Sequence, residues 1–434
     1  MKRVFLFSIL LALSTLLVAQ EKLTLEKALK IALHRNSKLI KSKNNLKADK
    51  SDVKSAWGDL LPTLSASGNW EYSKNKTAEG TKSGDGFGAT ISSNVTLFDG
   101  LANYASISKA EKGYDAAKFS INNLKQDIVY QTTAYYYNVL KAEELLKVRE
   151  ENVRYNQKFL EQIQEKNKLG SVPVADVYQQ QVQAGNAEFL LIKAQNNYEF
   201  SKNTLLNYLA LDVLNEYTFE KVSEKTSDMH SSDYEGEFAN LNEQVKKALF
   251  QRFDYKASKL DFEGAEDGIT IARSGLIPSI SGRASYSTSG KEVGDLFDMY
   301  GFTGSITLSI PIFSGWDTEN IIQKAKVTSS NAREDLSALE RQIKIDVKQG
   351  YLDLLASKKQ LDVANKKVTS AEENKKINNE RYNLGSGTII EVLQADKDFI
   401  QAQSDRIDAM YEFLTNRDLL RKHLGELEFS KYEK

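Results

Sequence analysis

The spacing of apolar residues changes along the chain in a pattern that occurs twice. Within 24–60, apolar residues lie three, four, seven and eight positions apart, as on one face of an α-helix; they are Leu25, Ala28, Leu29, Ala32 and Leu33. Pro62 should end this helix, because the residue before a proline is pushed out of the helical conformation. By the same reasoning we predict a single helix over 240–276, ended by Pro278.

After each proline the apolar residues alternate with polar ones, which indicates β-strands. The alternating segments are 64–73, 87–97, 280–287 and 302–312. One face of each is apolar, and the other is small and hydroxylated, with Glu71 and Arg283 as its charged exceptions. Strands of about ten residues cross a bilayer when tilted. We therefore predict two membrane hairpins, although two half-buried hairpins on a soluble domain are an alternative.

The hairpins should span about 63–98 and 279–313, with loops of about thirteen residues at their tips, 74–86 and 289–301. Beyond each hairpin the helical spacing returns. Apolar residues then recur at every seventh position, as in coiled coils; they are Val139, Leu146, Val153, Leu160, Val347, Leu354, Leu361 and Val368. We predict a helix over 100–168, roughly 100 Å long, followed by a shorter one over 174–210.

The chain therefore contains one plan twice, and three short sequences recur at a nearly constant offset. They are Leu61-Pro62 with Ile277-Pro278, Phe98-Asp99-Gly100 with Phe313-Ser314-Gly315, and Leu169-Gly170-Ser171 with Leu384-Gly385-Ser386. We divide the chain into a first repeat at 21–210, a polar linker at 211–238, a second repeat at 239–425 and a tail at 426–434. The helix hairpins of the repeats are expected at about 100–210 and 315–425.

Residues 1–20 have the pattern of a secretory signal peptide, cleaved after Ala19 or Gln20. Lys2 and Arg3 precede an apolar run that is short for a membrane anchor, which is the alternative. The formal net charge of -1 gives no basic excess of the kind nucleic-acid binders carry, so no nucleic-acid partner is expected. The chain has no cysteine, and its three histidines lie far apart. We expect no metal, no cofactor and no catalytic residues, and hence no enzyme.

Four strands are too few to close a membrane barrel, because the smallest such barrels have eight. Two chains would supply eight strands around an interior filled by side chains, and three would supply twelve around a lumen. Because the polar strand faces suit a water-filled lumen, three copies is the better prediction. The fold class is then mainly α with a trimeric β-barrel that continues into a helical tunnel.

With this duplicated order, its Leu-Pro strand starts, its Phe-x-Gly strand ends and its Leu-Gly helix turns, the chain resembles the TolC family of outer-membrane efflux and secretion channels over about 22–425. The resemblance implies a homotrimer in the outer membrane that extends into the periplasm. It implies a periplasmic adaptor (membrane fusion protein) and an inner-membrane pump as partners. The chain would be a passive conduit of a tripartite efflux pump or type I secretion system, for cargo that ranges from drugs and metal ions to siderophores and proteins.

The resemblance also implies a gate near the two helix turns. Leu169, Gly170, Leu384 and Gly385 would contact the adaptor, although each glycine also suits a helix end. Glu391 matches an acidic residue that projects into the closed entrance, and three copies would form a ring of carboxylates. A second acidic position falls on Gln394, and the basic residue that locks the family's gate falls on Gly387. Its partner position, Asp176, therefore lacks that bridge.

Tyr382 matches the tyrosine before the second turn. Glu391 and Asp176 also fit a simpler interpretation, since acidic residues suit the first turn of a solvated helix. A second hypothesis for the whole chain is a periplasmic coiled-coil adaptor or spacer without a pore. That hypothesis predicts a soluble mature protein and leaves the strands unexplained.

Overall fold

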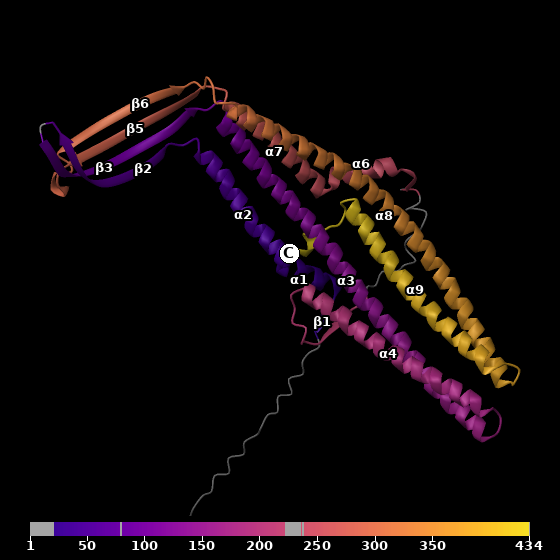
Figure 1. The fold of residues 1–434 in the computed structure, drawn as a ribbon. Coiled ribbons are helices and arrows are strands. Elements are labelled where there is room, and N and C mark those ends of the chain that lie inside the picture. The colour runs from indigo at the N-terminus through magenta and orange to yellow at the C-terminus, as the bar shows by residue number, and fades with distance from the viewer. Residues whose placement is uncertain (1–20, 79, 222–235, 237, 434) are drawn as a thin grey trace, which may run out of the picture.

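The computed structural model describes residues 21–78, 80–221, 236 and 238–433. The predicted signal peptide and much of the predicted linker lie outside the described residues. The molecule is elongated, with a sheet at one end and two helix turns at the other (Figure 1). Among the described helices, none is long and apolar enough to cross a membrane.

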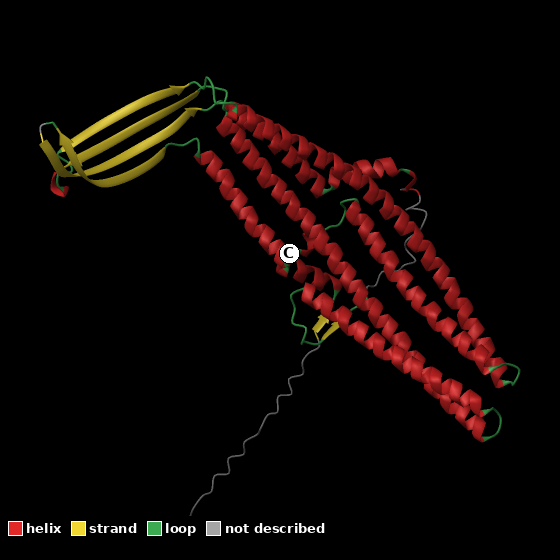
Figure 2. Ribbon diagram, in the orientation of Figure 1, coloured by secondary structure: helices red, strands yellow, loops and turns green. Residues whose placement is uncertain are grey.

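Each repeat has two short helices, a strand hairpin, one very long helix and one of intermediate length (Figure 2). The first repeat contains α1 (Leu25–Arg35), α2 (Ser37–Gly58), α3 (Ala102–Lys168) and α4 (Val174–Tyr208). The second contains α6 (Leu241–Gln251), α7 (Phe253–Ser274), α8 (Asp317–Asn383) and α9 (Ile389–His423). Helices α3 and α8 have 67 residues each, or roughly 100 Å at 1.5 Å per residue.

The prediction of unbroken helices over 24–60 and 240–276 is wrong, because each is interrupted at an equivalent residue. Asn36 and Arg252 are extended, with φ, ψ of -62°, 118° and -62°, 130°. The Asn36 side chain accepts hydrogen bonds from the backbone N–H groups of Lys38 and Leu39, so it caps α2. The Arg252 guanidinium instead pairs with the carboxylates of Asp254 and Asp346. The apolar spacing continues on both sides of each break and so conceals it.

Strands β2 (Thr63–Thr77), β3 (Gly80–Phe98), β5 (Ser279–Gly290) and β6 (Met299–Ser309) form one antiparallel sheet in the order β2-β3-β5-β6. The register of the sheet mostly places apolar residues opposite apolar ones and hydroxylated residues opposite hydroxylated ones. One row across the sheet contains Ala66, Ile91, Tyr286 and Phe302, and the next contains Ser65, Ser92, Ser285 and Thr303. The predicted division into an apolar face and a hydroxylated face is therefore continuous over all four strands.

The predicted loops at the hairpin tips are too long. The first pair of strands continues to Thr77 and Gly80, and only residues 291–298 separate β5 from β6. The alternation ends earlier in the sequence, because Lys74, Asn75 and Lys76 place polar side chains on both faces. Backbone pairing does not depend on that alternation and continues, with Lys76 opposite Thr81.

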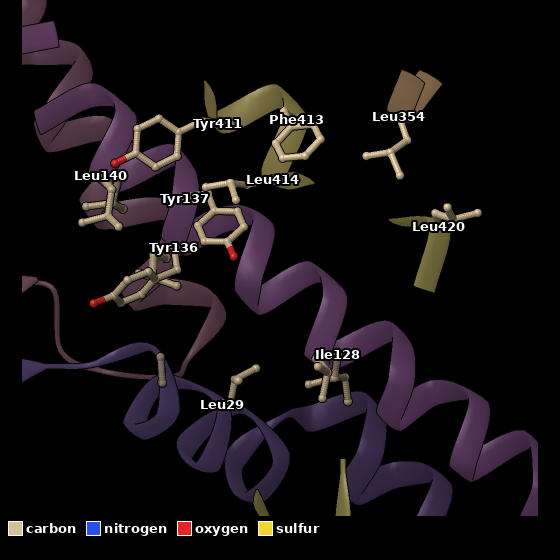
Figure 3. Packing of buried hydrophobic residues seen from close by; sticks show 14 of the residues in the cluster. Leu29, Ile128, Tyr136, Tyr137, Leu140, Leu354, Tyr411, Phe413, Leu414 and Leu420 are labelled. Atoms are coloured by element: carbon tan, nitrogen blue, oxygen red, sulfur yellow. The ribbon is translucent and has the colours of Figure 1, made fainter. Parts of the chain in front are cut away.

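The core lies where the short helices meet the middle of α3, α8 and α9 (Figure 3). The hydroxyl of the buried Tyr136 lies 2.9 Å and 2.8 Å from the carbonyl oxygens of Leu23 and Glu220. It thereby fixes β1 (Glu21–Leu23) and β4 (Tyr217–Phe219), two parallel three-residue strands, of which β4 lies within the predicted linker. The C-terminal tail packs here too, since Gln126 donates hydrogen bonds to the carbonyl oxygens of Gly425 and Leu427.

Candidate functional site

The two helix turns at the end opposite the sheet have the same backbone structure. Gly170 and Gly385 take left-handed conformations, with φ of 69° and 73°. The N–H of the serine after each glycine donates to a carbonyl five residues back, that of Lys166 or Arg381, at 2.8 Å and 2.9 Å. This is the glycine-dependent closure that satisfies the last carbonyls of a helix. The repeat thus produces two equal turns side by side.

Each turn exposes a large apolar side chain at its extremity. Leu169 is 80% exposed and Leu384 is 83% exposed, and each directly precedes the left-handed glycine. Exposed leucines at the end of a long hairpin are suited to contact another protein. The assignment of Leu169, Gly170, Leu384 and Gly385 to adaptor contact stays a prediction.

Asp176 and Tyr382, which lie far apart in the sequence, meet behind these turns. The Tyr382 hydroxyl, on α8, donates to Asp176 Oδ2, on α4, at 3.0 Å. Burial and the adjacent carboxylate both raise the pKa of Tyr382, so its hydroxyl stays protonated as the donor. With glycine at 387, Asp176 is bridged by this tyrosine, and the bridge joins the two helix hairpins of one chain.

Glu391 lies on the first turn of α9, and local groups hold both of its carboxylate oxygens. Oε2 accepts the backbone N–H of Thr388 at 2.8 Å, and Oε1 lies 3.3 Å from Arg381 Nη1. The Thr388 hydroxyl in turn accepts the N–H of Glu391, which completes a capping box. The pKa of Glu391 is lowered first by the Thr388 N–H, then by the Thr388 hydroxyl and Arg381. The carboxylate is therefore ionised and partly balanced by a guanidinium.

Gln394 lies one turn further along α9 and is exposed. Its amide donates to Asp398 Oδ1 at 2.9 Å, so an acidic group lies one turn beyond the neutral position. Arg381 and Thr388 were not predicted from the sequence as partners of Glu391. The signal for Thr388 was present, because a threonine three residues before a glutamate marks a capping box.

An apolar cluster supports the tip from within. It contains Phe159, Ile163, Val177, Tyr382, Ile389 and Val392, and so draws on α3, α4, α8 and α9. The Phe159 and Tyr382 rings meet edge to face at 6.0 Å. The gate candidates therefore lie beside one small core that both hairpins share. A shift of either hairpin would disturb the Tyr382–Asp176 hydrogen bond.

Comparison with known proteins places the whole arrangement among export channels of the outer membrane. The family described as "Outer membrane efflux protein" matches residues 28–211 and 244–426, one match for each repeat. The outer membrane protein TolC of Vibrio cholerae is 24% identical over 387 residues, covering 86% of this chain and 84% of the relative.

Solved structures agree in fold. The CmeC outer membrane channel of Campylobacter jejuni superposes with a TM-score of 0.82 at 16% identity, over 94% of this chain and 86% of that one. The outer membrane protein VceC of Vibrio cholerae gives a TM-score of 0.81 at 17% identity, over 92% and 96%.

Proposed function

This chain belongs to the outer membrane efflux protein family, and on that premise we propose that three copies of it form a gated export duct. The protein is an outer-membrane channel for efflux or secretion, and its helices extend into the periplasm. Its sheet is the membrane part, and its long helices form the periplasmic part.

The observation that carries the proposal is the amphipathic sheet with its two edges, β2 and β6. Strand edges cannot face lipid, because their backbone groups would lack hydrogen bonds there. Neighbouring strands in this sheet are antiparallel, so β6 of one copy can pair with β2 of the next without breaking the alternation. Three copies would close a ring of twelve strands with the hydroxylated face around the lumen.

The helical tip would be the gate of this duct. The Tyr382–Asp176 hydrogen bond joins the two hairpins of one chain, and the Glu391 carboxylate is ionised near the turn. Three copies would place three such carboxylates around the entrance, where they would attract cations. Opening would be a loosening of the hairpins at this tip, favoured by a partner that binds the open form better.

The partners would be a periplasmic adaptor and an inner-membrane pump, which supplies the energy. Leu169 and Leu384 would be the adaptor's apolar contacts, since both lie exposed on the turns. The alternative of a pore-free periplasmic adaptor receives no support from the sheet, whose apolar face is exposed along all four strands, for example at Leu64, Ile91 and Phe302.

The test is the conductance of the detergent-purified mature protein in a planar bilayer, repeated with a trivalent cation on either side. We expect stepwise currents that the cation blocks from one side. Currents without any block would remove Glu391 from the entrance. A mature chain that stays soluble without detergent and inserts into no bilayer would overturn the duct.

A further inference from the structure

A second polar connection between the two helix hairpins lies further from the helix turns than the Tyr382–Asp176 hydrogen bond. It centres on Asp396 of α9, whose side chain is 1% exposed although a charged group is costly to bury. Three side chains donate to its carboxylate. Lys375 of α8 donates to Oδ1 at 2.5 Å, and Asn152 and Asn156 of α3 donate to Oδ2 at 3.2 Å and 3.4 Å.

The connection extends to the fourth helix. Gln180 of α4, fully buried, donates to the backbone oxygen and to Oδ1 of Asn156 at 2.9 Å and 3.0 Å. One carboxylate thus links α8 and α9 of the second repeat to α3 and α4 of the first. The position equivalent to Asp396 in the first repeat, seven residues after the start of α4, is Gln181, which is exposed. Duplication of the chain did not produce this network.

An aromatic series connects the network to the tip. The Lys375 ammonium lies 3.8 Å from the centre of the Tyr155 ring, and Tyr155 stacks on Phe159 at 5.9 Å. Phe159 then meets Tyr382, the residue that binds Asp176. Tyr155 also donates to Asn379 of α8 at 3.0 Å. Movement of α8 relative to α3 would disturb the network and the Tyr382 bond together.

We propose that the buried Asp396 carboxylate is an internal latch that holds the two helix hairpins of one chain together and so sets the rest position of the tip. Asp396 is a positioning residue, because it acts through Tyr382 and does not line the entrance. A hydrogen bond to a buried charge is stronger than one between neutral groups. The latch therefore depends on the negative charge as well as on the shape of the side chain.

The direct test measures the spacing between the hairpins. Because the chain has no cysteine, nitroxide labels can be placed at Ser171→Cys and Glu380→Cys, both exposed and one on each hairpin. Labelled chains are assembled with an excess of unlabelled ones, so that pulsed electron paramagnetic resonance reports distances within one chain. The variant Asp396→Asn keeps the side-chain shape and removes the charge. Lys375→Met removes the opposite charge and serves as a second variant if Asp396→Asn fails to fold.

The control is Asp346→Asn, which weakens a largely buried ion pair with Arg252 in the middle of the molecule, away from the tip. We expect both latch variants to broaden and lengthen the distance distribution, whereas the control lowers thermal stability and leaves the distribution unchanged. A latch variant that melts at a lower temperature with an unchanged distribution would overturn the proposal and leave Asp396 with a purely structural role.

Single-channel current separates this proposal from the function on which it partly rests. Broadened spacing together with several-fold higher resting conductance supports both the latch and the gate at the tip. Broadened spacing with unchanged conductance, or with no channel at all, supports the latch and rejects the proposed gate. Unchanged spacing rejects the latch whatever the current.

Discussion

At the scale of single residues, Gly100 and Gly315 form a natural comparison, because they occupy the same place in the two repeats. Both are left-handed, with φ of 68° and 65°. A Cβ atom on Gly100 would lie 2.8 Å from Ile277 Cβ, whereas one on Gly315 would meet nothing within 4 Å. Backbone strain is therefore common to both positions, and crowding is specific to Gly100.

We predict that Gly315→Ala lowers the free energy of unfolding by about 1–2 kcal/mol, the cost of a left-handed residue with a Cβ. Gly100→Ala should cost about 1–3 kcal/mol more, because the new methyl group overpacks the junction with Ile277. Thermal unfolding of the two variants in one detergent measures the difference. Equal losses would mean that the junction relaxes around the added carbon.

Arg381 should weaken the attraction of the entrance for cations, because it lies beside Glu391. We predict that Arg381→Gln strengthens block of the channel by hexamminecobalt(III), and that Glu391→Gln weakens it. Gln401→Ala is the control, because it changes an exposed neutral residue on the same helix that lies further from the turn. If neither Arg381→Gln nor Glu391→Gln changed the block, the constriction would lie elsewhere.

The same block should depend on pH in a defined direction. A carboxylate loses its charge as the pH falls through its pKa, and the pKa of Glu391 is lowered from its ordinary value. Block should therefore persist at pH 5 and fade only below about 4.3, the usual pKa of glutamate. In Thr388→Val, which removes the hydroxyl of the capping box, fading should begin at a higher pH. Measuring the block at a series of pH values for both proteins tests this order.

At the scale of elements, Asn36 separates α1 from α2 and Arg252 separates α6 from α7, but the two side chains make different interactions. Asn36 caps α2 with its side-chain oxygen, which satisfies N–H groups that the helix cannot pair internally. We predict that Asn36→Ala lowers the free energy of unfolding by about 1 kcal/mol and speeds hydrogen exchange in the first turn of α2. Asn36→Asp should retain the cap and behave as wild type. Exchange that is unchanged in Asn36→Ala would show that packing alone holds this turn.

The sequence predicts elements with a strong period and misses those defined by single contacts. Alternation was sufficient for the four strands, and seven-residue spacing was sufficient for α3 and α8. The break at Asn36 depends on its side-chain oxygen, which accepts the backbone N–H groups of Lys38 and Leu39. Strand β1 depends on Tyr136, more than a hundred residues away. Such contacts leave no periodic pattern in the sequence, so they cannot be predicted from the spacing of apolar and polar residues.

The candidate site divides in the same way. Asp176, Tyr382 and Glu391 could be found because the family resemblance fixes their positions relative to the turns. Asp396 could not, since a charged residue on a polar helix is usually solvated, and its burial depends on four helices meeting. Arg381 was missed because its role depends on the fold of the second turn, which brings it back to Glu391.

At the scale of the whole molecule, the copy number is decided at the sheet edges. We predict that cysteines at Ser67 on β2 and Ser305 on β6 cross-link neighbouring chains when treated with a short bismaleimide, because these strands are opposite edges of one chain's sheet and can be neighbours only between chains. Both residues lie in hydroxylated rows of the sheet, and the chain has no cysteine of its own to compete. The control pair, Ser92→Cys with Ser285→Cys, lies on adjacent strands of one chain and should change no molecular weight.

The sizes of the cross-linked products decide between the possible rings. Three chains in a closed ring give covalent dimers and trimers and nothing larger, because each chain has one β2 edge and one β6 edge. Dimers alone would indicate an eight-stranded barrel, whose interior side chains would fill, and would contradict the duct. A ladder that extends beyond trimers would indicate an open assembly with edges left to face lipid, which the backbone does not tolerate. The hydroxylated face of the sheet favours the trimer, since serine and threonine side chains gain from a lumen that holds water.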